Sequence, residues 1–359
     1  MADDTGNDSL PPMATLNRMK APKNRGSKPR FRPSTFLIAI LIAALLIFAV
    51  KPNQLDVYKR FDELQFEDPA LARCVKESAA ANNWRKVGDA LKLRCNNPSG
   101  DGISSLAGIE HLVELTELNL SFNQISELEP LVPLARLQIL DLSHNRITGV
   151  PVLRSAPTLR RIELNYNQIE SLEWLTAEHF LALESLSIVH NHVADIARIP
   201  ALDGIRELSI RDNRIANLEP AWELRDLVML DVGKNLVEDI SGIGALGKLR
   251  RLFLDRNKIV SLDGIEALHN LEELDLAYNS LESTTAIASL ERLQRLNLTQ
   301  TGITSLEDVL SLGDLDLLRV PENPELPCAD IAVAIKEYGE TAIRSDKSCP
   351  DIDDATPKE

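Results

Sequence analysis

The chain has 359 residues, with 39 lysines and arginines against 54 aspartates and glutamates, and a formal net charge of −15 at pH 7. Residues 1–33 hold seven of the basic and three of the acidic residues, so the rest of the chain has 32 basic and 51 acidic residues, a balance of −19. Nucleic-acid binding needs a basic surface that neutralises phosphates, and this composition excludes it.

The first 50 residues predict a basic tail followed by a membrane span. Residues 1–33 contain few large apolar groups and are expected to be disordered. Residues 34–50, STFLIAILIAALLIFAV, carry no charge, and a helix of 17 residues extends about 26 Å, which is slightly short but workable for a bilayer core. The basic residues upstream leave the N-terminus in the cytoplasm.

A cleaved signal peptide is the alternative interpretation of this segment. The basic region would be unusually long, and for a cut after Ala49 the bulky Ile47 stands where a small residue is required. We therefore expect an uncleaved, single-pass signal anchor in the inner (cytoplasmic) membrane. All residues after Lys51 then lie in the periplasm or outside the cell.

A helical N-terminal cap is expected over residues 51–102. Asp68 and Pro69 form a helix start signal ahead of the segment ALARCVKESAAANN. The following ALKLRC is typical of a strand, and NNPSGDG is typical of a loop.

Residues 103–326 repeat the frame L-x-x-L-x-L-x-x-N-x-I-x-x-L. The frame opens every 22 residues, except for one interval of 24 residues between Leu159 and Leu183. In x-L-x-L-x one face of a short strand points inward and the other faces solvent. The openings are Leu115, Leu137, Leu159, Leu183, Ile205, Leu227, Leu249, Leu271, Leu293 and Leu315.

This pattern resembles the leucine-rich repeat family, in the 22-residue class found in bacterial internalins and in a eukaryotic phosphatase regulatory subunit. The resemblance covers about residues 91–326. It implies an α/β fold, a right-handed solenoid or horseshoe with a parallel β-sheet on its concave side. No repeat can bury its leucines alone, so each depends on its neighbours.

An asparagine follows the strand in nearly every repeat and is predicted to be structural. Its side-chain amide has both donors and an acceptor. It can therefore bond the backbone N–H and C=O groups of the turn that have no partner in a strand ladder. Thr301 interrupts the column, and a hydroxyl can perform only part of this bonding. The column contains Asn123, Asn145, Asn167, Asn191, Asn213, Asn235, Asn257, Asn279 and Asn323.

Each end of the repeat array carries a pair of cysteines, Cys74 with Cys95 and Cys328 with Cys349, and both pairs are separated by 21 residues. Four cysteines allow three pairings, of which only the local one staples each cap separately. Four reduced, buried thiols are the alternative, which an oxidising compartment disfavours.

The C-terminal cap is expected over residues 327–350, with one helix in ADIAVAIKEYG that covers the last repeat. The covering residues are predicted to be Ile331, Val333, Ala334 and Tyr338. Residues 351–359 are expected to form a disordered tail.

The sequence predicts no enzyme, cofactor, metal site or small-molecule substrate. It contains no phosphate-binding glycine loop, no zinc-type spacing and no nucleophile elbow. In His-Asn-His at 190–192 the asparagine belongs to the structural column, and His144 lies two strands from His190, about 9.6 Å away, too far to share a metal. Asn119 and Asn297 match a glycosylation acceptor by chance, because both fall inside strands.

Function is therefore expected on the solvent-facing positions of the concave face. Ten strands about 4.8 Å apart give an inner arc of roughly 43 Å, which suits a protein ligand. Phe253 is the only apolar residue between the second and third leucines of the frame, beside arginines as in an interface anchor. The residues before the asparagines form an aromatic strip over four repeats. The predicted contact residues are Phe122, His144, Tyr166, His190, Arg211, Met229, Arg251, Phe253, Asp255 and Tyr278.

Two interpretations of these side chains stay open. Single exposed apolar residues are ordinary, and the aromatic strip could pack against neighbouring repeats instead of reaching solvent. If the residues are contacts, this exported, membrane-anchored protein binds a partner protein through its concave face. Its role is then recognition, adhesion or scaffolding. The resemblance to internalins implies surface recognition, and that to the phosphatase regulator implies tethering an enzyme. An architectural envelope protein without a discrete ligand is a further alternative.

Overall fold

The computed structural model describes residues 58–97, 102–150, 157–175, 180–197, 199, 204–313, 315–347 and 349. These residues belong to one compact unit, Pro52–Glu359. The predicted basic tail, the predicted span over residues 34–50 and the tail over residues 351–359 lie outside the described ranges. Within those ranges, no helix combines the length and the apolar character needed to cross a membrane.

The described residues form one parallel sheet of twelve strands in sequence order. The ten repeat strands and the cap strand β1 agree with the sequence prediction, whereas β12 was not predicted. The strands are β1 (Lys92–Arg94), β2 (Glu117–Asn119), β3 (Ile139–Asp141), β4 (Arg161–Glu163), β5 (Ser185–Ser187), β6 (Glu207–Ser209), β7 (Met229–Asp231), β8 (Arg251–Phe253), β9 (Glu273–Asp275), β10 (Arg295–Asn297), β11 (Leu317–Arg319) and β12 (Ile343–Arg344).

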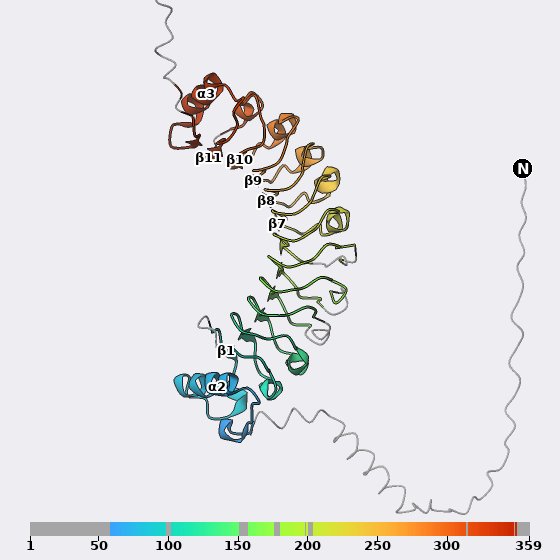
Figure 1. Cartoon of the computed structure of the whole chain (residues 1–359), viewed down its shortest axis with the longest axis vertical. Coiled ribbons are helices and arrows are strands. Elements are labelled where there is room, and N and C mark those ends of the chain that lie inside the picture. The colour runs from blue at the N-terminus through green and yellow to red at the C-terminus, as the bar shows by residue number, and fades with distance from the viewer. Residues whose placement is uncertain are drawn as a thin grey trace, which may run out of the picture. The chain divides into compact units, whose positions relative to one another are not determined.

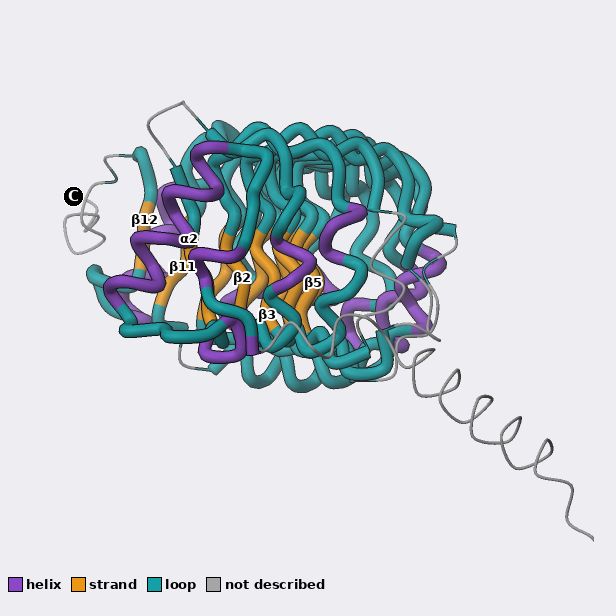
Figure 2. Tube along the Cα trace, turned by 90° about the horizontal axis from the view of Figure 1, so that it is seen from below, coloured by secondary structure: helices purple, strands orange, loops and turns teal. Residues whose placement is uncertain are grey.

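The strands lie along the concave side of this unit and short helical turns lie along its convex side (Figure 1). In Figure 2 the strands form a single row with the connecting loops around it. A repeat of this length leaves few residues for the convex side, so tight 3-10 turns replace longer helices. They are η5 (Ile109–His111), η6 (Glu129–Leu131), η8 (Glu219–Glu223), η9 (Ser241–Ala245), η10 (Ile265–Ala267), η11 (Thr285–Ser289) and η12 (Val309–Ser311), with η3 (Phe61–Glu63) and η4 (Val87–Asp89) in the N-terminal cap.

The core is one continuous stack of leucines and isoleucines between the strands and the convex turns. The central residue of each repeat strand, such as Leu118, Leu230 or Leu252, is buried, and its two neighbours face the concave side. Each layer therefore covers the next, as expected for a nearest-neighbour solenoid.

The asparagine column is structural, as predicted. Asn235 is typical, because its Nδ2 donates to the carbonyls of Ile210 (3.0 Å), Val232 (3.0 Å) and Gly233 (3.2 Å). Its Oδ1 accepts the N–H of Ile215 in the preceding repeat at 3.0 Å. The amide thus bonds backbone groups of two layers at once.

Thr301 shows how one repeat manages without this amide. Its hydroxyl donates to the carbonyl of Leu298 at 2.8 Å, and the N–H of Leu281 bonds the backbone carbonyl of Thr301 at 3.0 Å instead of a side-chain oxygen. The next residue, Gly302, has φ +79°, a backbone conformation that favours glycine. The backbone therefore takes over part of the bonding that asparagine provides elsewhere.

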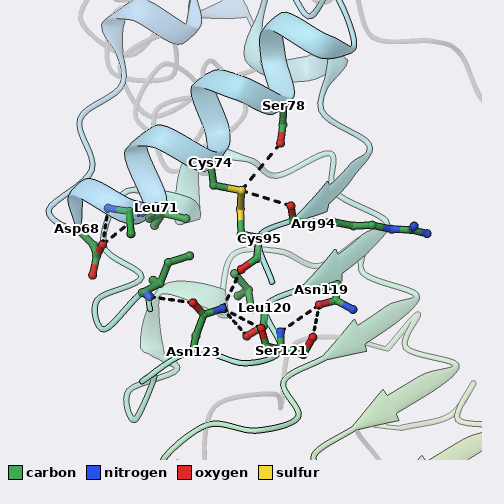
Figure 3. The surroundings of a disulfide bond; sticks show 12 residues. Asp68, Leu71, Cys74, Ser78, Arg94, Cys95, Asn119, Leu120, Ser121 and Asn123 are labelled. Atoms are coloured by element: carbon green, nitrogen blue, oxygen red, sulfur yellow. Dashed lines mark hydrogen bonds between the residues drawn. A yellow bond between two sulfur atoms is a disulfide. The ribbon is translucent and has the colours of Figure 1, made fainter. Parts of the chain in front are cut away.

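The N-terminal cap helix α2 (Pro69–Ala81) starts where the sequence predicts. One carboxylate oxygen of Asp68 accepts hydrogen bonds from the N–H groups of Ala70 and Leu71 at the start of α2 (Figure 3). The other oxygen accepts hydrogen bonds from the N–H groups of Ser104 and Ser105. Burial opposes ionisation of Asp68, but these four donors outweigh it and lower its pKa. This residue therefore joins the cap to the first repeat.

The C-terminal helix α3 (Cys328–Tyr338) covers the last repeat through Ile331 and Ala334, which are buried. The Tyr338 hydroxyl donates to the carbonyl of Val309 at 2.8 Å. The prediction for Val333 was wrong, since this side chain is 43 % exposed. It lies two residues from Ile331, which places it away from the buried face of a helix.

The structure confirms both local disulfides, Cys74–Cys95 and Cys328–Cys349, and leaves no cysteine free. Figure 3 shows that the first bridge ties α2 to the end of β1. Cys95 also supplies a carbonyl that Asn123 bonds at 2.8 Å, so the bridge and the asparagine column meet here.

Removing the first bridge with Cys74→Ser plus Cys95→Ser should lower the stability of the N-terminal cap by about 3 kcal/mol, because the opened chain gains conformational freedom. Amide hydrogen exchange should accelerate in α2 and β1 and stay unchanged around β9, since solenoid layers couple to nearest neighbours. Removing the second bridge is the matched control and should affect α3 and β12. Uniform acceleration along the chain would contradict local stapling.

Candidate protein-binding surface

Each repeat strand presents two residues to the concave side, and the parallel register aligns them into columns. The second column is the set of residues at the ends of β2 to β11, and its in-register alignment agrees with the sequence prediction. It consists of Asn119, Asp141, Glu163, Ser187, Ser209, Asp231, Phe253, Asp275, Asn297 and Arg319.

Four rings stack along one edge of the concave face, and we call Phe122, His144, Tyr166 and His190 the aromatic ladder. The ring centroids are 4.1 Å apart between Phe122 and His144, 4.2 Å between His144 and Tyr166, and 4.7 Å between Tyr166 and His190. Phe122 is still 44 % exposed and Tyr166 45 % exposed. The rings therefore pack on neighbouring repeats and also reach solvent, and their role as partner contacts stays a prediction.

The ladder occupies a backbone position that opposes its residue types. All four residues have φ between 55° and 60°, in the left-handed region. This conformation costs a non-glycine residue roughly 1–2 kcal/mol. The same position is left-handed in six further repeats, and none of the ten residues is glycine or asparagine. The six are Asp212, Lys234, Arg256, Tyr278, Gln300 and Glu322.

In the following repeats, the residues at the same position as the ladder make polar and charged contacts. His190 Nδ1 lies 2.8 Å from Asp212 Oδ2, and Lys234 Nζ lies 3.7 Å from the same oxygen. Arg256 lies over the ring of Tyr278, 3.9 Å from its centroid. One face of Tyr278 is thus covered by Arg256, and the side chain is only partly exposed, whereas Tyr166 is 45 % exposed.

Phe253 lies between two aspartates of the second column, Asp231 on β7 and Asp275 on β9, and is half-buried. Both aspartates accept the N–H of the residue two positions later, Gly233 and Ala277, each at 3.0 Å. A phenylalanine cannot accept this bond. The local structure therefore gives no reason for an aromatic side chain at position 253.

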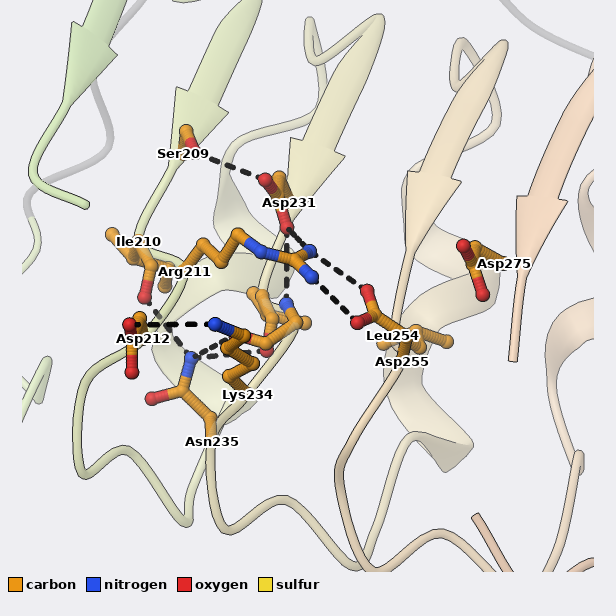
Figure 4. Close-up of polar contacts among 12 residues, drawn as sticks. Ser209, Ile210, Arg211, Asp212, Asp231, Lys234, Asn235, Leu254, Asp255 and Asp275 are labelled. Atoms are coloured by element: carbon orange, nitrogen blue, oxygen red, sulfur yellow. Dashed lines mark hydrogen bonds and ion pairs between the residues drawn. The ribbon is translucent and has the colours of Figure 1, made fainter. Parts of the chain in front are cut away.

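Arg211 and Asp255 bind each other across the layer between them. The two terminal nitrogens of Arg211 contact the two carboxylate oxygens of Asp255 at 2.7 and 2.5 Å, and Nη1 also lies 3.2 Å from Asp231 (Figure 4). A Cβ on Gly233 would stand 2.2 Å from Arg211 Nη1, so only glycine leaves room for this crossing. Asp255 is 6 % exposed, so these two residues support the surface from beneath.

Several carboxylates of the second column lack full solvation. Burial raises the pKa of Asp231 and of Asp275, and the nearby charge of Asp255 raises both further. Burial and the adjacent charge of Asp141 likewise raise the pKa of Glu163. The floor of the concave face is thus negatively charged and partly desolvated.

The sequence also contains a histidine motif and two glycosylation matches, and the latter two, Asn119 and Asn297, belong to the second column. Among the described residues, no three histidines, cysteines or carboxylates are close enough to hold a metal ion. The two predicted chance glycosylation matches carry amides already bonded inside the sheet. Asn119 donates to Asp141 at 2.7 Å, and Asn297 donates to Asp275 at 3.0 Å.

The repeating unit also matches known sequence families. The family described as leucine-rich repeats in two copies matches residues 135–177, and two families described as leucine-rich repeat match residues 247–303 and 114–127. The chain is built of leucine-rich repeats. A search of curated protein sequences finds no match to this leucine-rich-repeat chain.

Solved structures show the same fold. An internalin, InlF, from Listeria monocytogenes has a TM-score of 0.61 and 23 % identity, with 80 % of this chain and 90 % of that chain covered. The functional domain of InlJ from the same organism has a TM-score of 0.62 and 22 % identity, covering 75 % and 60 %. A leucine-rich-repeat protein of Leptospira interrogans has a TM-score of 0.50 and 21 % identity, covering 66 % and 74 %. At these identities the similarity establishes the fold and leaves the ligand open.

Sequence inspection missed the supporting role of Arg211 and Asp255 and the importance of Asp231, Asp275 and Gly233. A signal was present, because Arg211, Gly233 and Asp255 occupy the same repeat position in three successive repeats. When an arginine and an aspartate stand on either side of a glycine at one repeat position, the pattern predicts a salt bridge that passes over the glycine. The other predicted residues of the region, Met229 and Arg251, lie side by side on β7 and β8 next to Phe253.

Proposed function

We propose that residues 34–50 anchor this protein in the inner membrane and that its leucine-rich repeats bind a partner protein through the concave face, in the periplasm or outside the cell. Two disulfides favour an oxidising compartment. The uncharged span and the basic residues before it support the anchor and its orientation. Proteins built of such repeats typically act as interaction scaffolds with extended concave binding surfaces.

The aromatic ladder carries the proposal for the concave face. It places four rings in contact over about 13 Å, across three strand spacings, at the edge of the sheet. The same left-handed turn occurs in six further repeats, five of them with polar or charged residues at this position, so the backbone does not require the four aromatic side chains. Tyr166 and Phe122 also remain substantially exposed, as aromatic anchors of interfaces do before binding.

In-cell crosslinking followed by mass spectrometry tests this proposal. Tyr166→Ala plus Phe253→Ala should reduce capture of the partner at least about tenfold, since aromatic anchors commonly contribute more than 1 kcal/mol each. Leu236→Ala plus Val260→Ala removes two exposed apolar side chains outside the strands and is the matched control. The control should capture the same partner as the unmodified protein.

Circular dichroism and thermal melting must show that the Tyr166 and Phe253 variant is folded, because loss of stacking alone costs about 0.5–1.5 kcal/mol per ring pair. Separation of the same cells into membrane and soluble fractions reports the anchor. If both double variants and the unmodified protein capture one set of proteins, the concave aromatics are not contacts. An architectural role would then be the better interpretation.

A further inference from the structure

The surroundings of Phe253 hold more negative charge than the chain neutralises. Asp231 and Asp275 flank the ring in register, and Asp255 lies two residues further along the same chain segment. Arg211 directs both terminal nitrogens to Asp255 and one of them also to Asp231. Asp231 and Asp255 therefore share one guanidinium group, and Asp275 has no part in it.

The oxygens of Asp275 bond neutral donors, the N–H of Ala277 and the Nδ2 of Asn297, each at 3.0 Å. Figure 4 shows Asp275 on the far side of Asp255 from Arg211, on the next strand. The side chain of Asp275 thus faces the concave surface with its charge uncompensated by a salt bridge to Arg211. Removing such a carboxylate from water in a complex is costly unless the partner supplies a cation.

The arginines of the neighbouring strand positions are directed to other acids. Arg251, beside Phe253, lies 3.7 Å from Glu207, and Arg295 lies 3.9 Å from Glu273. These pairs balance the first residues of the strands and leave the second column acidic. The excess charge at Phe253 is therefore a local property of the second column.

A second place on the same column combines carboxylates with aromatic rings. Asp141 and Glu163 lie in register on β3 and β4, and Tyr166 and His144 of the ladder follow them in the same repeats. Glu163 is three strands from Asp231, about 14 Å at the usual strand spacing. Both faces of His144 and of Tyr166 are covered by stacked rings, so a cationic side chain at this place gains an ion pair with the carboxylates rather than a cation–π contact.

Extending the concave-face function proposed above, on which this inference rests, we propose that the partner presents a basic segment in which arginine or lysine flanks an apolar side chain. The apolar side chain packs on Phe253, and the flanking cations pair with Asp231 and Asp275. In an extended segment, alternate residues point to one face about 6.6 Å apart, so Arg-x-Phe-x-Arg presents all three groups together. The positive charge and the apolar contact are complementary to this part of the concave face.

Fluorescence anisotropy of two twelve-residue peptides with the full chain in detergent tests the inference. One peptide carries two Arg-Ala-Phe-Ala-Arg segments, and the other has glutamate in place of every arginine. The basic peptide should bind at least about tenfold more tightly, the equivalent of roughly 1.4 kcal/mol. Asp231→Asn plus Asp275→Asn should remove that preference while keeping an oxygen for the N–H groups of Gly233 and Ala277.

Asp239→Asn plus Asp263→Asn removes the same charge outside the strands and should leave the preference unchanged. Equal binding of the two peptides, or a preference that survives Asp231→Asn plus Asp275→Asn, overturns the inference. The in-cell capture separates it from the proposed function. If a partner is lost with Tyr166→Ala plus Phe253→Ala but is still captured with Asp231→Asn plus Asp275→Asn, the concave face binds a partner without needing these carboxylates. That result supports the proposed function and overturns only the proposal of a basic partner segment. Capture of no partner at all overturns both.

Discussion

Asn235→Ala should lower the free energy of unfolding by about 4 kcal/mol, the largest effect expected of a single side chain outside the core. The substitution removes an amide nitrogen whose two N–H groups contact three carbonyls, and an oxygen that accepts one N–H group, at a site that is 6 % exposed. Each buried backbone group left without a partner costs about 1–3 kcal/mol, and water can reach some of them. Urea denaturation followed by circular dichroism measures the change.

Asn235→Thr is the matched control, because Thr301 performs the same role elsewhere in the chain. The threonine hydroxyl keeps the contact with one carbonyl, as Thr301 does with Leu298. Position 236 is leucine, so the backbone adjustment seen at Gly302 is less accessible there. The loss should be about half that of Asn235→Ala. Equal stability of all three proteins would show that the asparagine column is dispensable.

Arg211→Met should lower the free energy of unfolding by about 3–4 kcal/mol, because it leaves Asp255 buried without its partner. The repulsion among Asp231, Asp255 and Asp275 then has no cation to offset it. Arg251→Met is the control on the same face. Its pair with Glu207 is long, at 3.7 Å, and exposed, so the loss should stay within about 0.5 kcal/mol.

The deficit of Arg211→Met should shrink as the pH falls below 7. Asp231 and Asp275 have pKa values raised above the ordinary 3.8 in the folded protein. A raised folded-state pKa gives stability that is present at low pH and is lost as the pH rises through that pKa. Without Arg211 both values should rise further, so protonation relieves more repulsion. Denaturation at pH 7 and pH 5 checks this, and a deficit that grows on acidification would contradict it.

Much of the fold follows from the periodicity of the sequence. The spacing of the leucines predicted ten repeat strands in the observed register, and Asp68 and Pro69 marked the start of α2. The equal separation of the two cysteine pairs favoured the bridges that the structure contains. These features are local, since the strand pairing and the asparagine bonding of each repeat involve its immediate neighbours and the same chemistry recurs in every layer.

The chemistry of the concave face depended on side chains that reach beyond their own layer. Arg211 and Asp255 are 44 residues apart and meet because Gly233 has no side chain in their path. The ladder rings are distributed over four repeats, and a left-handed turn in each directs them onto one another.

The sequence by itself determined the repeat architecture, the structural asparagines, the caps and the position of the candidate surface, because a strict period places every strand residue inward or outward. The tertiary structure alone decided that Arg211 and Asp255 support the surface, that Phe253 is half-buried between two carboxylates and that Val333 faces solvent. Those outcomes depend on side-chain reach and direction between layers, which a period in the sequence does not specify.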